Sequence, residues 1–213
     1  MSSILKPEQE KYLSKFIKEK DPLILEMEEY ALQNHVPILS KDSAAFLEQQ
    51  IRITNPKRVL ELGTAIAYSS IRIARNLKKK SVVYTIEKSK DNLKIAKKNI
   101  AMSGLEVKIH LIFGNALEEL PKINKKFDFI FLDADKTDYK KLFDYSLILL
   151  KKGGMIFVDN LLWHGLAASS KIPKEQKNST KVIREFNEIF STRANLITTI
   201  LPIGDGIGLG IKK

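Results

Sequence analysis

Short apolar segments alternate with amphipathic segments through most of the chain. Five stretches are nearly continuous in β-branched, aromatic and aliphatic residues, which is typical of strands buried on both faces of a parallel sheet. They are 58–62, 81–87, 107–114, 127–133 and 154–160. The segments between them, 67–78, 89–103, 115–120 and 138–151, carry apolar residues at helical spacing. This alternation predicts right-handed βαβ units in an α/β, Rossmann-like, doubly wound sheet with helices on both faces.

The two ends of the chain depart from this alternation. Residues 4–19 and 22–34 have the pattern of amphipathic helices broken at Asp21-Pro22, and a third helix is expected over 43–54. After a helix at about 179–191, apolar segments flank Gly204-Asp205-Gly206, which predicts an antiparallel hairpin. We therefore expect seven strands, the last pair antiparallel to its neighbours. One domain would span 1–213, with 1–54 as an N-terminal helical cap segment and 55–213 as the core.

Composition narrows the class of protein. A chain of 213 residues with 44% hydrophobic content suits one globular domain. The absence of cysteine excludes a disulfide framework, a thiolate metal site and a cysteine nucleophile. The first residues lack the apolar segment of a signal peptide, and no apolar run approaches the roughly 20 residues that cross a bilayer. We expect a cytoplasmic protein without a membrane partner.

The charge is strongly positive, with 36 Lys and Arg against 25 Asp and Glu, a net charge of +11. A basic surface concentrates polyanions such as RNA, nucleotides or anionic lipid. A lysine-rich proteome bias accounts for the same composition, so charge alone leaves nucleic acid binding open.

Polar residues at the ends of the first three strands predict a nucleoside site. Ligands of open α/β sheets bind at the carboxyl ends of the strands. Gly63 permits a tight turn after the first strand, and Glu87 ends the second, where an acid accepts hydrogen bonds from ribose hydroxyls. Asn115 and Ala116 follow the third strand and are placed to edge an adenine.

The loop after the first strand argues against a dinucleotide. It has Ala65 and Ala67 in place of the glycines of G-x-G-x-x-G, and it carries Glu61, which would repel a phosphate but suits a cationic ligand. A nucleoside cofactor without phosphates fits better. The alternative is a plain strand-turn-helix with an acidic neighbour.

The fourth and fifth strands end in groups that suit a metal ion. Asp133 follows the fourth strand, and Asp159-Asn160 follow the fifth. Adjacent strand ends lie about 4.8 Å apart, so two carboxylates and an amide oxygen can converge. Such hard oxygen ligands favour Mg²⁺, with Ca²⁺ or Mn²⁺ in its place, and leave positions for a substrate with two adjacent oxygens. The alternative is that these carboxylates are ordinary loop residues.

Lys136 is the expected general base, since a nearby dication lowers the pKa of an amine. Asp135 either lines the substrate pocket or tunes Lys136, and Asp138 is expected to begin the next helix.

The segment after the fifth strand is the expected substrate side. Trp163 either stacks on a planar ring or is a core or hinge residue, and His164 is expected to be a loop residue. The basic residues of 170–184 form either a solvated face or a phosphate-contact patch at the mouth of the site. They are Lys171, Lys174, Lys177, Lys181 and Arg184.

Taken together, these motifs resemble a known family. The segments VLELGTAIAYSS, YTIE, GNA, FIFLDADKTDY, VDNLLWHG and PIGDGIGL resemble those of the class I S-adenosylmethionine-dependent O-methyltransferases of the metal-dependent catechol and caffeoyl-CoA type. The likeness runs from about His35 to the C-terminus. It is greatest to a bacterial branch with HVPI near the N-terminus, which contains the tRNA 5-hydroxyuridine methyltransferases.

The resemblance implies roles for individual residues. Those implied to contact S-adenosylmethionine are Ile38, Leu39, Glu61, Gly63, Ser69, Glu87, Asn115, Ala116 and Asp133. Lys136 would be catalytic, Asp133, Asp159 and Asn160 would hold the metal, and Asp135, Trp163 and Arg184 would face the substrate. Two positions depart from the branch, since Ala67 replaces a usual Gly and Asn115 a common Asp. Relatives are usually homodimers, so a homodimer is expected.

Three functions remain as hypotheses. The first is a methyltransferase that uses S-adenosylmethionine and Mg²⁺ to convert 5-hydroxyuridine to 5-methoxyuridine at the wobble position of the tRNA anticodon loop. The alternative is an O-methyltransferase for small catechol-like molecules, because both substrates present two vicinal oxygens. A noncatalytic nucleic-acid-binding domain is the third, and it has no use for Asp133, Asp159 and Asn160.

Overall fold

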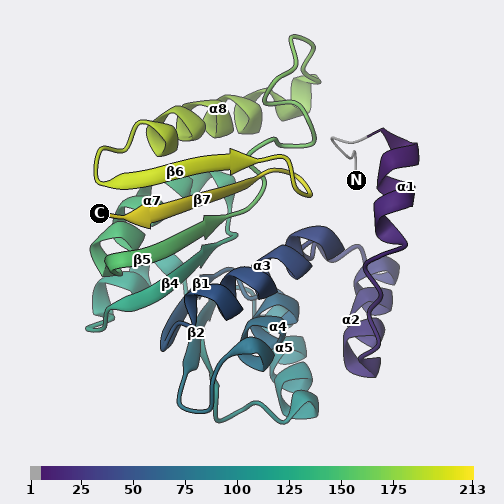
Figure 1. Cartoon of the computed structure of the whole chain (residues 1–213), viewed down its shortest axis with the longest axis vertical. Helices are drawn as coiled ribbons and strands as arrows, with labels where there is room; N and C mark the ends of the chain where they lie inside the picture. The colour runs from purple at the N-terminus through teal and green to yellow at the C-terminus, as the bar shows by residue number, and fades with distance from the viewer. Residues whose placement is uncertain (1–5) are drawn as a thin grey trace.

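The computed structural model describes residues 6–213, which form a seven-stranded sheet in the order β3-β2-β1-β4-β5-β7-β6 (Figure 1). The strands are β1 Arg58–Leu62, β2 Val82–Glu87, β3 Ile109–Phe113, β4 Phe127–Leu132, β5 Leu150–Val158, β6 Leu196–Leu201 and β7 Ile207–Lys212. β1 to β5 pair in parallel, and β7 is antiparallel to both β5 and β6. The predicted mostly parallel sheet with a C-terminal antiparallel hairpin is confirmed.

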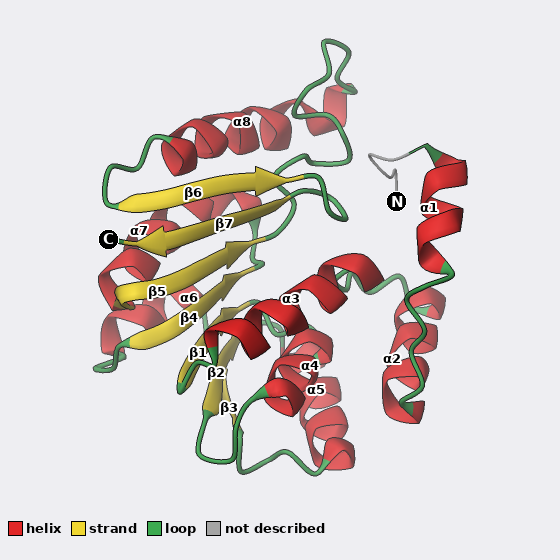
Figure 2. Cartoon of the chain, in the orientation of Figure 1, coloured by secondary structure: helices red, strands yellow, loops and turns green. Residues whose placement is uncertain are grey.

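Helices lie on both faces of the sheet (Figure 2). They are α1 Pro7–Ser14, α2 Pro22–Gln33, α3 Lys41–Thr54, α4 Tyr68–Asn76, α5 Lys90–Ser103, α6 Ala116–Glu119, α7 Tyr139–Leu149 and α8 Lys177–Ser191. Strand residues alternate between two buried clusters: Val59 packs with residues of α2 to α5, whereas Leu60 and Leu62 pack with residues of α7 and α8. Within residues 6–213, no helix is both long and apolar enough to span a membrane.

The first N-terminal helix is shorter than the pattern predicts. Of the helix expected over 4–19, positions 4 and 5 lie outside the described residues, and α1 ends at Ser14. The following connection is held by Glu19, whose carboxylate accepts hydrogen bonds from Asp21 N and from Arg72. α2 then begins as expected, because Asp21 caps it by accepting from Leu23 N at 3.0 Å and Pro22 occupies its first turn.

β5 begins four residues earlier than expected, at Leu150, so the helix predicted over 138–151 ends sooner. The strand was expected to begin at 154, directly after the first residue of the glycine pair 153–154. Instead the register with β4 changes from Phe127↔Leu150 to Phe129↔Met155, so the extra residues form a bulge within β5. Gly153 has φ 75°, which suits this irregular backbone.

Candidate active site

The ends of four parallel strands meet at one edge of the sheet. Leu62 of β1 pairs with Ile86 of β2 and with Leu132 of β4, and Leu132 pairs with Val158 of β5. The residues that follow these strands line one cavity of about 630 Å³. Of the expected site residues, it brings together Ile38, Gly63, Glu87, Asn115, Ala116, Asp133, Asp135, Lys136, Asp159, Asn160 and Trp163. Leu39, Glu61, Ser69 and Arg184 are not among its lining residues.

Gly63 is required where the chain leaves β1. Its φ is +102°, and a Cβ built there would be 1.8 Å from the carbonyl oxygen of Asp133. The first loop and the end of β4 therefore touch through backbone atoms. This contact joins the expected cofactor half of the cavity to the expected metal half.

Glu87 fixes the same loop from the end of β2. Its Oε2 accepts from Ala65 N at 2.8 Å, and its Oε1 accepts from Ser89 N at 2.7 Å. The carboxylate is nearly buried yet lines the cavity. Each oxygen has a further lone pair, so Glu87 can still accept from a ligand hydroxyl.

Glu61 and Ser69 lie behind this loop. Glu61 is fully buried, and its carboxylate accepts from Ser69 Oγ at 2.5 Å and from Ser70 Oγ. Burial raises the pKa of Glu61 to about 7, against the two hydroxyl hydrogen bonds, which lower it. In this arrangement Glu61 holds the first turn of α4 in place.

Two further expected cofactor contacts differ in placement. Ile38 lines the cavity, whereas the neighbouring Leu39 is buried in the cluster packed under α2 to α5. Asn115 lines the cavity beside Ala116, and its side chain also caps α6 by accepting from Leu117 N at 3.0 Å.

Lys136 is a nearly buried cation on the opposite side of the cavity. Its Nζ donates to Asp133 Oδ1 at 3.1 Å and to the Tyr139 hydroxyl at 2.6 Å. Burial lowers the pKa of Lys136, but the attractions of Tyr139 and Asp133 outweigh burial, so the pKa is raised. The amine is therefore protonated as long as Asp133 has no other cation beside it.

Tyr139 was not singled out from the sequence. Besides accepting from Lys136, its buried hydroxyl donates to the backbone oxygen of Asp159 at 3.1 Å. It thus connects the ends of β4 and β5. Its position three residues after Lys136, at the start of α7, was the available signal.

Asp159 has an unpartnered oxygen. Oδ1 is buried and accepts no hydrogen bond from any described residue. Burial, followed by the charge of Asp133, raises the pKa of Asp159 to about 8. Across the described residues, no three His, Asp or Glu side chains gather as a metal-binding group; the set here has two carboxylates and the Asn160 amide.

Asp135 is at the exposed rim of the cavity. Its Oδ1 accepts from Thr137 N at 3.1 Å and from Thr137 Oγ1 at 2.8 Å, and these bonds lower the pKa of Asp135. Its Oδ2 is 3.6 Å from Nζ of Lys88, a cavity residue that the sequence analysis missed.

Trp163 belongs to both of its expected environments. It packs against the cluster under α7 and α8, and it lines the cavity. Its Nε1 donates to Gln176 Oε1 at 3.2 Å. Arg184 instead donates to the carbonyl oxygens of Leu166, Ala167 and Ser169, so it secures the loop after β5.

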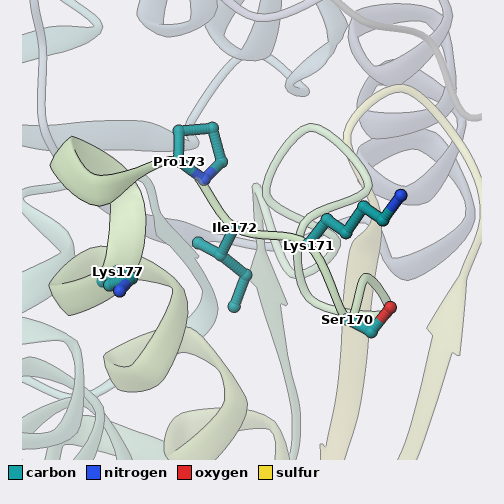
Figure 3. Close-up of a pocket in the computed structure, with 5 residues that line it drawn as sticks. All are labelled: Ser170, Lys171, Ile172, Pro173 and Lys177. Carbon is teal, nitrogen blue, oxygen red and sulfur yellow. The ribbon is translucent and has the colours of Figure 1, made fainter.

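The basic segment forms a separate open hollow of about 610 Å³, lined by Ser170, Lys171, Ile172, Pro173 and Lys177. In Figure 3 the side chains of Lys171 and Lys177 do not point toward one another. They therefore do not enclose a single anion, which is consistent with a solvated basic face.

The cavity combines two capabilities. The Gly63–Glu87 side offers an acceptor for a ribose, and the Asp133–Asp159–Asn160 side offers hard oxygen donors for a cation. A reaction between two ligands held on these sides would be favoured by proximity.

Known proteins share both the sequence and this fold. The sequence profile described as O-methyltransferase matches residues 14–213. A caffeoyl-CoA O-methyltransferase of Populus kitakamiensis is 35% identical over 176 residues, 79% of this chain and 75% of that protein. A catechol O-methyltransferase of Niastella koreensis is 30% identical over 95% of each chain. The solved O-methyltransferase of Bacillus cereus in complex with SAH has 28% identity and a TM-score of 0.83, covering 95% of this chain and 96% of that one.

Proposed function

Because the chain belongs to the O-methyltransferase family and is an S-adenosylmethionine-dependent enzyme, we propose that its substrate is a small catechol-like molecule with two vicinal oxygens. One hydroxyl receives the methyl group. The observation that supports this proposal is that Asp159 Oδ1 is buried and has no hydrogen-bond partner among residues 6–213, in the same cavity as Asp133, Asn160 and the Gly63–Glu87 loop.

A divalent cation fits this donor set. Asp133, Asp159 and Asn160 would hold it through oxygen atoms, which Mg²⁺ prefers, with Mn²⁺ or Ca²⁺ as replacements. It would give Asp159 Oδ1 a partner that none of the described residues provides. When bound, the cation supplies positive charge that lowers the pKa of a substrate hydroxyl.

The cofactor half would be held by the residues on the other side. Glu87 would accept hydrogen bonds from the ribose hydroxyls, and Asn115 and Ala116 would lie along the edge of the adenine. Gly63 would let the backbone approach the cofactor closely. Ile38 covers the methionine part. Ser69 acts with Glu61 from behind the loop, since their side chains are bonded to one another.

The reaction is an in-line displacement. The substrate oxygen attacks the methyl carbon of the sulfonium, the carbon–sulfur bond breaks, and its electron pair stays on sulfur in S-adenosylhomocysteine. Lys136 first releases its own proton to solvent, and the neutral amine then takes the proton of the substrate hydroxyl. Tyr139 and then Asp133 raise the pKa of Lys136, and a cation beside Asp133 would weaken the second of these two attractions.

The substrate ring would lie against Trp163, with Asp135 at the rim. Two relatives carry names that fit this class, a caffeoyl-CoA and a catechol O-methyltransferase.

The tRNA wobble-uridine activity is the second candidate, and the net charge of +11 favours it. A 5-hydroxyuridine base presents the same pair of adjacent oxygens as a catechol. The lysines of 171–181 would contact backbone phosphates.

The experiment compares the two substrate classes directly. Purified protein with labelled S-adenosylmethionine and Mg²⁺ is given catechol, caffeoyl-CoA or tRNA containing 5-hydroxyuridine. We expect transfer to a small molecule and none to the tRNA. Transfer to tRNA alone, at the uridine 5-oxygen, would replace the first proposal with the second.

A further inference from the structure

The turn between β6 and β7 reaches the end of β5 through one acidic side chain. Asp205 lies in this turn, and its side chain is 14% exposed. Its Oδ2 accepts from Asn160 Nδ2 at 3.3 Å, and its Oδ1 accepts from the backbone N of His164 at 2.5 Å. Both carboxylate oxygens are thus used to hold the loop that follows β5.

The contact with Asn160 fixes the orientation of an amide. A carboxylate only accepts hydrogen bonds, so the amide must turn its NH₂ group toward Asp205. The amide oxygen, which alone can coordinate a cation, is then directed away from Asp205. We propose that Asp205 is a positioning residue that presents Oδ1 of Asn160 to the cavity, an inference that rests on the metal site of the proposed function.

The backbone around Asn160 needs such support. Asn160, Trp163 and His164 have φ of 63°, 47° and 55°, in the left-handed region that non-glycine residues rarely adopt. Each such conformation costs on the order of 1 kcal/mol or more and persists only where the surroundings enforce it. The bond from His164 N to Asp205 is one such constraint.

The β6–β7 turn lies close enough to the loop after β5 to hold the Asn160 side chain in this orientation. Leu161 N donates to Gly206 O, and Leu162 N donates to Asp205 O, each at 2.9 Å. A Cβ at Gly206 would be 2.7 Å from Leu162 N, so only glycine permits the approach. The β6–β7 turn therefore packs directly against the loop that carries Asn160, the third expected metal ligand.

The alternative is that Asp205 only stabilises the turn. A purely structural residue would change the melting temperature but leave the affinity for a cation unchanged below melting. A positioning residue changes the affinity itself, by about 10- to 100-fold for partners of metal ligands.

The first test measures Mn²⁺ binding by electron paramagnetic resonance in the full-length parent and in Asp205→Asn. Glu185→Gln is the matched control, because it removes one carboxylate on the exposed face of α8. We expect Asp205→Asn to bind Mn²⁺ about 10- to 100-fold more weakly, with the control unchanged. S-adenosylmethionine affinity, measured by calorimetry, should stay at the parent value and show that the variant is folded.

A double-mutant cycle adds the decisive comparison. In Asn160→Asp both terminal atoms of the side chain are oxygens, so either one can coordinate the cation whichever way the group is turned. The new carboxylate also has the same charge as Asp205. Asp205→Asn should therefore weaken Mn²⁺ binding more beside Asn160 than in the Asn160→Asp background, where only the loss of one negative charge near the cation remains. Equal loss in both backgrounds, or parent-like affinity of Asp205→Asn, would overturn the inference. A parent protein that binds no Mn²⁺ would overturn both the inference and the metal site of the proposed function.

Discussion

Nζ of Lys136 is 3.1 Å from Oδ1 of Asp133, so the expected base is paired with an expected metal ligand. The pair is largely shielded from solvent on the lysine side, where Tyr139 also accepts from Nζ. The ammonium therefore occupies the neighbourhood that a cation would enter. Binding of a cation and release of the lysine proton are coupled in this geometry, because both act on Asp133.

Replacing Lys136 by Arg tests its role as a base. Arginine keeps a positive charge beside Asp133 but does not release its proton at ordinary pH. We expect kcat to fall about 10²- to 10⁴-fold, the usual contribution of general base catalysis. Lys140→Arg, in an exposed ion pair on α7, is the matched control. Steady-state kinetics measure both, and parent-like kcat in Lys136→Arg would exclude the base role.

Gly63→Ala should be strongly destabilising. The added Cβ would collide with the Asp133 carbonyl oxygen at 1.8 Å, and the backbone has φ of +102°. Together these effects lower the free energy of unfolding by about 3 kcal/mol or more. Gly104→Ala isolates the backbone effect, because its φ is +67° and an added Cβ would meet no described atom within 4 Å beyond its chain neighbours, so about 1 kcal/mol is expected. Urea unfolding of the two variants measures the difference, and equal losses would contradict the close contact.

Glu61 predicts a pH dependence of stability. Burial raises its pKa from 4.5 to about 7 in the folded chain, so between these values the folded state binds more protons than the unfolded state. This contribution to stability is complete below pH about 4.5 and is lost as the pH rises through about 7. Glu61→Gln removes the titration, so its stability relative to the parent should be greater at pH 8 than at pH 5.

Urea unfolding at both pH values checks this prediction, with Glu185→Gln as the exposed control. A relative stability of Glu61→Gln that does not change with pH would show that Glu61 has an ordinary pKa.

Glu87→Gln should weaken cofactor binding. The Gln keeps the shape but loses the charge and one acceptor beside the loop. Hydrogen bonds to charged groups contribute about 1.5 to 3 kcal/mol, so we expect the Kd for S-adenosylmethionine to rise about tenfold or more. Calorimetry measures it against Glu106→Gln, an exposed loop residue. Equal affinities of the two variants would remove Glu87 from the cofactor site.

The sheet could be predicted because its signal is local. Apolar segments such as 127–132 end in charge, and strands of this kind are typical of parallel sheets covered on both faces. The start of β5 could not be predicted, since glycines 153 and 154 are compatible with either a break or a bulge. Only the pairing with β4 decides between them.

For the site residues, it was harder to predict toward which face of the sheet each side chain points. Glu61 alternates with Leu60 and Leu62, so its side chain points toward α4 and is held by Ser69 rather than lining the cavity. That alternation was visible in the sequence. The contacts of Arg184 with the loop carbonyls and of Asp205 with Asn160 were not, because they join residues that are 15 to 18 and 45 positions apart.

In the proposed function, methyl transfer needs two adjacent substrate oxygens and a divalent cation. Labelled methyl transfer to catechol and to phenol is measured in protein stripped with EDTA and again after Mg²⁺ is restored. We expect a methylated catechol only with Mg²⁺, and no methylated phenol, which lacks the second oxygen. Transfer to catechol that persists in EDTA, or equal transfer to phenol, would contradict it.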